Sequence, residues 1–132
     1  MLLIKTPDQE LFDAVYTISS KFGYSTYDHL STDEIPYPFV VVGDTQIVSP
    51  PTKVTGIAPN ISIRVDAWGN KKQRQEVSNM LNALLKAARQ LHRTQNYTWQ
   101  IRNQASSPQL IGDNSTGSFL WHGILEIEMK LK

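Results

Sequence analysis

A segment with strict alternation of apolar and polar side chains, residues 60–68, constrains the fold of this chain more than any other feature. Its apolar residues occupy every second position: Ile61, Ile63, Val65 and Ala67. Because successive side chains of a strand point to opposite faces of a sheet, this period predicts a β-strand with one buried face. Such a strand needs a second layer to cover its apolar side.

The residues that follow predict a long amphipathic helix as that covering layer. Gly69 and Asn70 end the strand, and Asn70 with Gln73 has the spacing of a helix N-cap. The apolar residues then recur at intervals of three and four: Val77, Leu81, Leu84, Ala88 and Leu91, widened by Met80 and Leu85. A coiled-coil seam is the alternative, but the stripe covers barely two heptads, so we expect packing on the domain's own sheet.

Another helix is predicted near the N-terminus, over residues 7–22. Thr6 can cap it, Pro7 takes a favoured first-turn position, and Gln9 has capping-box spacing from Thr6. Its apolar residues have helical spacing: Leu11, Val15, Ile18 and Phe22. Gly23 provides the stop, because glycine readily adopts the left-handed conformation that ends helices.

Residues 39–42 are uniformly apolar and predict a strand buried on both faces, which we expect to stop at Gly43 and Asp44. Residues 43–60 then read as an extended arm. Residues 45–48 could extend a strand, but three prolines and a glycine before Asn60 interrupt any regular ladder.

The arm is almost uncharged and rich in aliphatic residues. Its candidate contact residues are Ile47, Val48, Lys53, Val54 and Ile57, of which only Lys53 is charged. One interpretation is a disordered surface loop. The other is an arm that orders against a neighbouring subunit, since a solvated loop of this length usually carries more charge and fewer aliphatics.

Three more strands are predicted towards the C-terminus. They lie near residues 97–102, near residues 109–111, and over a long apolar-alternating run from Phe119 to Leu131, whose centre we expect to pair on both sides. The element order predicts one α+β domain over residues 1–132, with an antiparallel or mixed sheet and both helices packed on one face.

The chain offers little that predicts chemistry. It contains no cysteine, and its three histidines lie in separate elements without metal-site spacing. Glu126 and Glu128 would share a strand face about 7 Å apart, but with Lys130 they fit the solvent face of an amphipathic strand. The sequence therefore predicts no enzyme, no cofactor, no metal site and no membrane span.

One local charge signal remains in a chain of net charge +1. Lys71, Lys72 and Arg74 precede the second helix, where cations oppose the helix dipole. A solvated first turn is the simplest interpretation. The functional alternatives are a salt bridge to an acidic partner or contact with nucleic-acid phosphate.

Taken in order, these segments resemble the tail-terminator, or tail-completion, proteins of long-tailed bacteriophages. The likeness rests on the helix at 7–22, the proline-strand-Gly-Asp unit at 37–44, the strand at 61–68 with its following helix, and the terminal strand at 122–127. It implies a structural virion protein, made in the host cytoplasm, that forms a homo-oligomeric ring of six subunits around a DNA channel. It also implies contacts with the tail tube protein and a head-completion protein, and an arm that reaches a neighbouring subunit.

Two other functions are kept as alternatives. A small ligand-binding or hydrolase-like α+β domain would need a pocket with convergent polar groups, and the sequence shows no such cluster. A nucleic-acid-binding module would need exposed aromatics on strands, whereas the aromatic residues here fit core positions.

Overall fold

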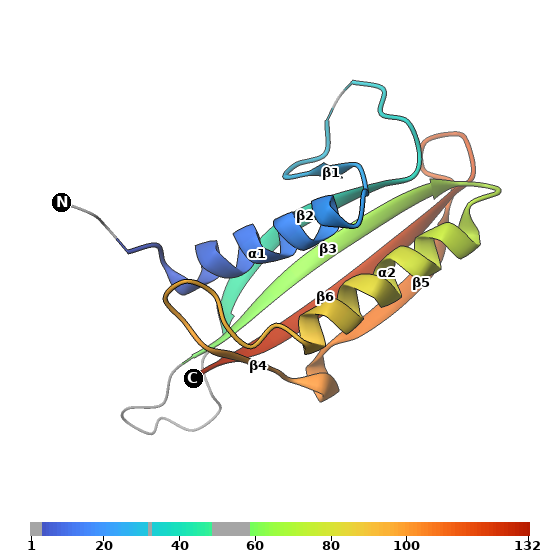
Figure 1. Ribbon diagram of the computed structural model, residues 1–132. Helices are drawn as coiled ribbons and strands as arrows, with labels where there is room; N and C mark the ends of the chain where they lie inside the picture. The colour runs from blue at the N-terminus through green and yellow to red at the C-terminus, as the bar shows by residue number, and fades with distance from the viewer. Residues whose placement is uncertain (1–3, 32, 49–58) are drawn as a thin grey trace.

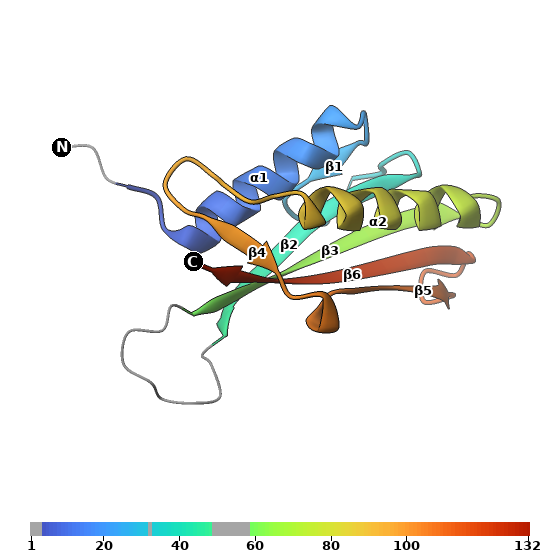
Figure 2. The same ribbon diagram turned by 60° about the horizontal axis from the view of Figure 1, so that its bottom comes forward.

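The chain builds a mixed β-sheet with two helices on one face, as the computed structural model shows (Figures 1 and 2). The structure describes residues 4–31, 33–48 and 59–132. Its elements are α1 (Pro7–Lys21), β1 (Thr26–Tyr27), β2 (Phe39–Val48), β3 (Asn60–Asn70), α2 (Arg74–Arg89), β4 (Trp99–Ile101), the short 3₁₀ helix η1 (Asn103–Ala105), β5 (Ser107–Asp113) and β6 (Leu120–Leu131). The predicted α+β class is confirmed.

The sheet has the strand order β1-β2-β3-β6-β4, and β5 also pairs with β6. β1 and β2 are parallel, while the other pairs are antiparallel, so the sheet is mixed. β6 pairs with β3 along one edge, and with β5 and then β4 along the other. The prediction that the last strand pairs on both sides is confirmed.

The core lies between the sheet and the two helices. In β3 the alternating residues Ile61, Ile63, Val65 and Ala67 are all buried, as the period of two predicts. In α2 the whole predicted stripe from Val77 to Ala88 is buried, and Leu91 packs partly against it. Gly123 of β6 lets α2 approach closely, because a Cβ there would lie 2.6 Å from Leu81 Cδ1.

The helix ends differ from the sequence expectations in their details. Thr6 is the N-cap of α1, but its side chain makes no capping hydrogen bond, and Gln9 donates to Asp13 instead. Gly23 has φ 87°, the left-handed conformation expected of a helix stop. The N-cap of α2 is Gln73 rather than Asn70, and these two side chains bond backbone N–H groups in the preceding turn.

Three further expectations need correction, and one strand was not foreseen. The strand that begins at Phe39 does not stop at Gly43 and Asp44 but continues to Val48. The strand predicted near 109–111 runs from Ser107 to Asp113. The second helix ends at Arg89, so Leu91, the last residue of the predicted stripe, lies beyond the helix. The two-residue strand β1 was not foreseen, because it lies in a polar stretch without alternation.

No helix among the described residues is both long enough and apolar enough to cross a membrane.

Candidate subunit interface

The outer edge of β2 is the first candidate surface, because only the start of this strand has a neighbour on that side. β1 pairs with Val40 and Val41 alone. β3 pairs with the opposite edge as far as Val48. Within the described chain, residues 43–48 therefore have no strand on their outer side. A strand edge with unpaired N–H and C=O groups is a template for adding another strand.

A β-bulge explains why β2 continues past the glycine that was expected to end it. Val42 pairs with Val65 and Thr45 with Ile63, so Gly43 and Asp44 together lie opposite a single residue of β3, Arg64. A bulge keeps the ladder intact while the bulged strand bends. The sequence cannot show this, because a bulge and a strand end both favour Gly-Asp.

The bulge also sets the faces of the rest of β2. Thr45 and Ile47 pair with the buried Ile63 and Ile61, so they lie on the side of the sheet that carries the helices. Gln46 and Val48 lie on the other side, which we call the open face. Ile47 is 58% exposed although its partner Ile61 is fully buried.

The five predicted interface residues thus divide into two groups. Ile47 and Val48 belong to β2, so the arm does not begin at residue 43 as expected, and Asn60 already belongs to β3. Lys53, Val54 and Ile57 lie outside the described residues. The structure therefore brings the arm's first aliphatic residues onto a free strand edge.

The basic residues 71–74 lie where β3 turns into α2. Trp121 of β6 reaches this turn: its Nε1 donates to the Lys71 carbonyl oxygen at 3.2 Å, and the Arg74 guanidinium lies 5.2 Å from its ring centroid. Arg74 is thus engaged by a cation–π contact within the chain. Lys71, Lys72 and Arg74 are all exposed, so each of the three remains accessible to a partner.

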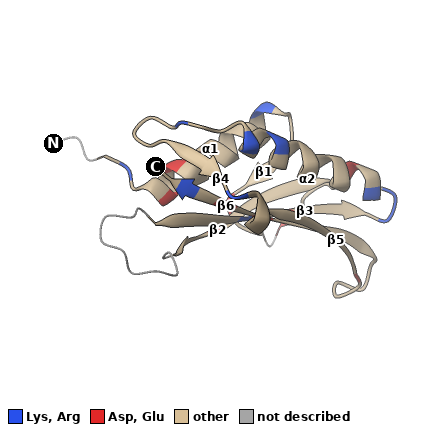
Figure 3. Ribbon diagram, turned by 90° about the horizontal axis from the view of Figure 1, so that it is seen from below, with Lys and Arg blue, Asp and Glu red and all other residues tan. Residues whose placement is uncertain are grey.

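The basic character of this region extends along the whole of α2. Residues 71–93 hold six of the chain's 13 Lys and Arg residues but a single acidic residue, Glu76. Figure 3 shows the basic residues at both ends of the helix. The exposed positions between them are mostly amides: Gln75, Asn79 and Asn82. The remainder of the chain has more acidic than basic residues.

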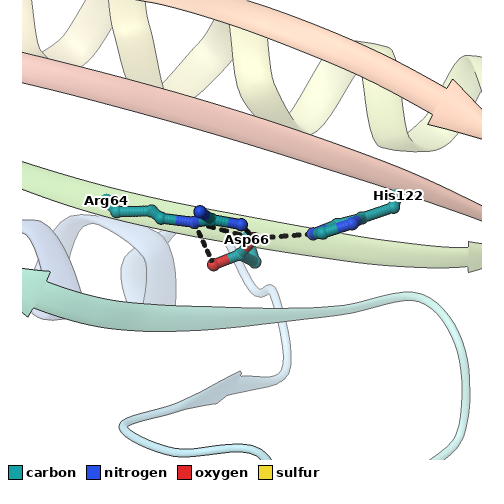
Figure 4. Close-up of polar contacts among 3 residues, drawn as sticks. All are labelled: Arg64, Asp66 and His122. Carbon is teal, nitrogen blue, oxygen red and sulfur yellow. Dashed lines mark hydrogen bonds and ion pairs between the residues drawn. The ribbon is translucent and has the colours of Figure 1, made fainter.

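A polar cluster on the open face was not foreseen (Figure 4). His122 Nε2 lies 2.6 Å from Asp66 Oδ1, and Arg64 Nη2 donates to the same oxygen at 3.0 Å. The His122 ring stacks on Trp68, with ring centroids 3.8 Å apart and planes 9° apart. His122 is only 8% exposed, so this ring is a buried part of the cluster.

The carboxylate of Asp66 stays ionised in this cluster. Burial raises its pKa, but hydrogen bonds from His122 and Arg64 lower it by more, and the net pKa lies below the ordinary value. Only the register of β3 against β6, which pairs Trp68 with His122 and Asp66 with Ile124, brings these groups together. The sequence signal was limited to Arg64 and Asp66 lying two residues apart on one strand face.

The two carboxylates of β6 do not act as a pair. Glu128 is engaged by Arg102 in a salt bridge and accepts a hydrogen bond from Asn60 Nδ2 at 3.5 Å. Glu126 is exposed on the open face near Arg64. In the part of the chain that the structure describes, no three His, Cys, Asp or Glu side chains gather where they could hold a metal ion.

Comparison with known proteins adds no relative. No model of a known protein family matches the chain, and no curated protein matches it.

Proposed function

We propose that this chain is a structural protein that assembles head to tail with copies of itself into a ring, and that the ring caps the tail tube of a long-tailed phage and joins it to the head-completion protein. The observation that carries the proposal is the outer edge of β2, where the exposed Ile47 lies beside backbone groups that no strand of the described residues pairs. Monomeric proteins usually protect such an edge with lysine, proline or a covering segment.

The fold supports the same proposal in a general way. The helix, strand, strand, helix and closing strands appear in the order that the resemblance to tail-completion proteins implies. A ring needs two different contact patches on each subunit, since each copy must bind one neighbour with each of them. The edge of β2 is one such patch.

The proposal is tested with a variant that changes the patch and not the core. We expect Ile47→Asp to abolish self-association, because it puts a charge into the contact, while leaving the unfolding temperature nearly unchanged, because Ile47 is 58% exposed. The matched control is Leu30→Asp, which alters a residue that is 60% exposed and lies outside the sheet.

The same two variants test the role at the tail. Tail tubes assembled from the tube protein of the same virus should carry one ring at one end, and stop growing, when the wild-type protein or Leu30→Asp is added. Ile47→Asp should leave the tubes uncapped in electron micrographs. Uncapped tubes with the wild-type protein would refute the tail-capping function.

A second candidate function is contact with nucleic acid through α2. The specific observation in its favour is the concentration of Lys and Arg over residues 71–93, interspersed with exposed amides. Cations and amide side chains are the groups that contact phosphate oxygens without reading sequence. This function is compatible with a ring, because a ring around DNA needs contacts that do not depend on sequence.

A further inference from the structure

The sheet has a second free edge, and it belongs to β5. β5 pairs with β6 from Ser107 to Asp113, and no strand of the described chain lies on its other side. β4, which shares that edge of β6, is closed off: Trp99 N donates to the His92 carbonyl oxygen, and Arg93 forms a bridge with Thr98. The free edges of β2 and β5 lie on opposite sides of the sheet (Figure 1).

We propose that the β2 edge of one copy pairs with the β5 edge of the next, so that the sheets of neighbouring subunits join into one continuous antiparallel sheet. This inference rests on the proposed head-to-tail assembly and names its contact. The occupant of each edge is therefore a second copy of this chain.

Strand direction fits this junction. From one free edge to the other the order is β2, β3, β6, β5, and each neighbouring pair is antiparallel. Because the number of strands is even, β5 runs opposite to β2. Copies related by a simple rotation about a ring axis, without being turned over, then meet as antiparallel strands, and the two different edges form a heterologous contact.

The residues of the two edges are compatible with pairing. Neither residues 43–48 nor residues 107–113 contain a Lys or Arg, the usual guards of an edge strand. Each edge also exposes an isoleucine: Ile111 on β5 is 37% exposed, and Ile47 on β2 is 58% exposed. Pro108 removes a single N–H donor from the junction. The bulge at Gly43 and Asp44 leaves residues 45–48 as the regular part of the β2 edge.

The faces and charges of the edges select a register. The open face must continue across the junction. In β5 the odd-numbered residues lie on the open face, because Gln109 and Ile111 pair with Ile124 and His122 of β6. Gln46, which lies on the open face of β2, must therefore pair with an odd-numbered residue of β5. Pairing Gln46 with Ile111 would put Asp44 opposite Asp113, which like-charge repulsion disfavours. Pairing Gln46 with Gln109 avoids that contact.

The pairing of Gln46 with Gln109 also has a reasonable stagger. Through β3 and β6, Gln46 is in register with Glu128, whereas Gln109 is in register with Ile124, an offset of four residues over four strands. Closed sheets of tilted strands commonly have a stagger of about one residue per strand, as in eight-stranded barrels with a shear of eight. A ring can therefore close with this offset.

Cysteine cross-linking tests the junction, because the natural chain contains no cysteine. Gln46→Cys combined with Gln109→Cys places two thiols opposite each other across the junction, at the separation of cross-strand neighbours that a disulfide spans. Mild oxidation should give a ladder of covalent multimers up to the full ring on a non-reducing gel. Each single variant should give at most a dimer, since it has one thiol per copy.

Two further pairs serve as controls. Gln46→Cys with Ile111→Cys tests the register and should cross-link much less. Gln46→Cys with Asn79→Cys puts the second thiol on the outer face of α2, because Asn79 is exposed and projects away from the buried stripe of the helix, and this pair should give no ladder. Gln46, Gln109 and Asn79 are exposed polar residues, so the reduced variants at these positions should melt at nearly the wild-type temperature.

The outcomes separate this inference from the proposed function. If the wild-type protein assembles but the Gln46–Gln109 pair gives no ladder, or the Asn79 control gives an equal one, the sheet junction is refuted while the ring survives. If the wild-type protein does not assemble and no pair gives a ladder, the junction and the proposed head-to-tail assembly are both refuted.

Discussion

At the scale of single residues, the open face of the sheet is held by charge-assisted hydrogen bonds as well as by apolar packing. Asp66 accepts hydrogen bonds from Arg64 and contacts Nε2 of His122, and the face of the His122 ring stacks on Trp68. These bonds lower the pKa of Asp66 in the folded protein. A carboxyl whose pKa is lower in the folded than in the unfolded state contributes stability above its unfolded pKa and loses it as the pH falls through the folded pKa.

We therefore predict that Asp66→Asn reduces the free energy of unfolding at neutral pH by about 1–3 kcal/mol, the cost of weakening bonds at a mostly buried group. The ordinary pKa of an aspartate is 3.8. Between neutral pH and this value, the difference in free energy of unfolding between wild type and variant should stay nearly constant. Below this pH the difference in free energy should shrink.

Denaturant unfolding at several pH values measures this. Asp33→Asn, an exposed substitution, is the control and should be nearly neutral. The account of this cluster would be contradicted if the difference in free energy of unfolding between wild type and Asp66→Asn grew as the pH fell below 3.8.

At the scale of elements, the sequence predicted the helices and strands whose apolar residues recur periodically. It did not predict the features that depend on the register between strands. The alternation in β3 and the apolar stripe of α2 were sufficient to predict these two elements, because each pattern results from burial of one face. The bulge at Gly43 and Asp44 was not predictable, since its evidence is a shift of pairing against β3. For the same reason the sequence could propose Ile47 and Val48 as contact residues but could not place them in a strand at the edge of the sheet.

The basic outer face of α2 leads to a prediction at this scale. The double variant Lys86→Gln and Arg89→Gln should weaken binding to duplex DNA and reduce the slope of log affinity against log salt by roughly two, because each lost phosphate contact removes about 0.9 from that slope. Lys130→Gln with Lys132→Gln removes the same charge from the exposed end of β6 and should change the slope much less. Equal effects of the two double variants would indicate that net charge, and not α2, governs binding.

At the scale of the whole molecule, the account depends on an asymmetry of the sheet. The edges of β2 and β5 that no strand of the described residues covers differ in sequence and lie on opposite sides, so in the proposed assembly each copy binds two neighbours with two different surfaces. A contact of this kind either closes into a ring or continues as a filament, whereas a contact between identical patches stops at a two-fold dimer. The number of subunits therefore reports directly on the kind of contact.

Native mass spectrometry of the wild-type protein, at the highest concentrations at which it stays in solution, is the most direct test. We predict one discrete assembly of six chains of 14.9 kDa each, in equilibrium with monomer and without a dominant dimer. A protein that stays monomeric throughout, or that stops at a dimer, would contradict head-to-tail assembly.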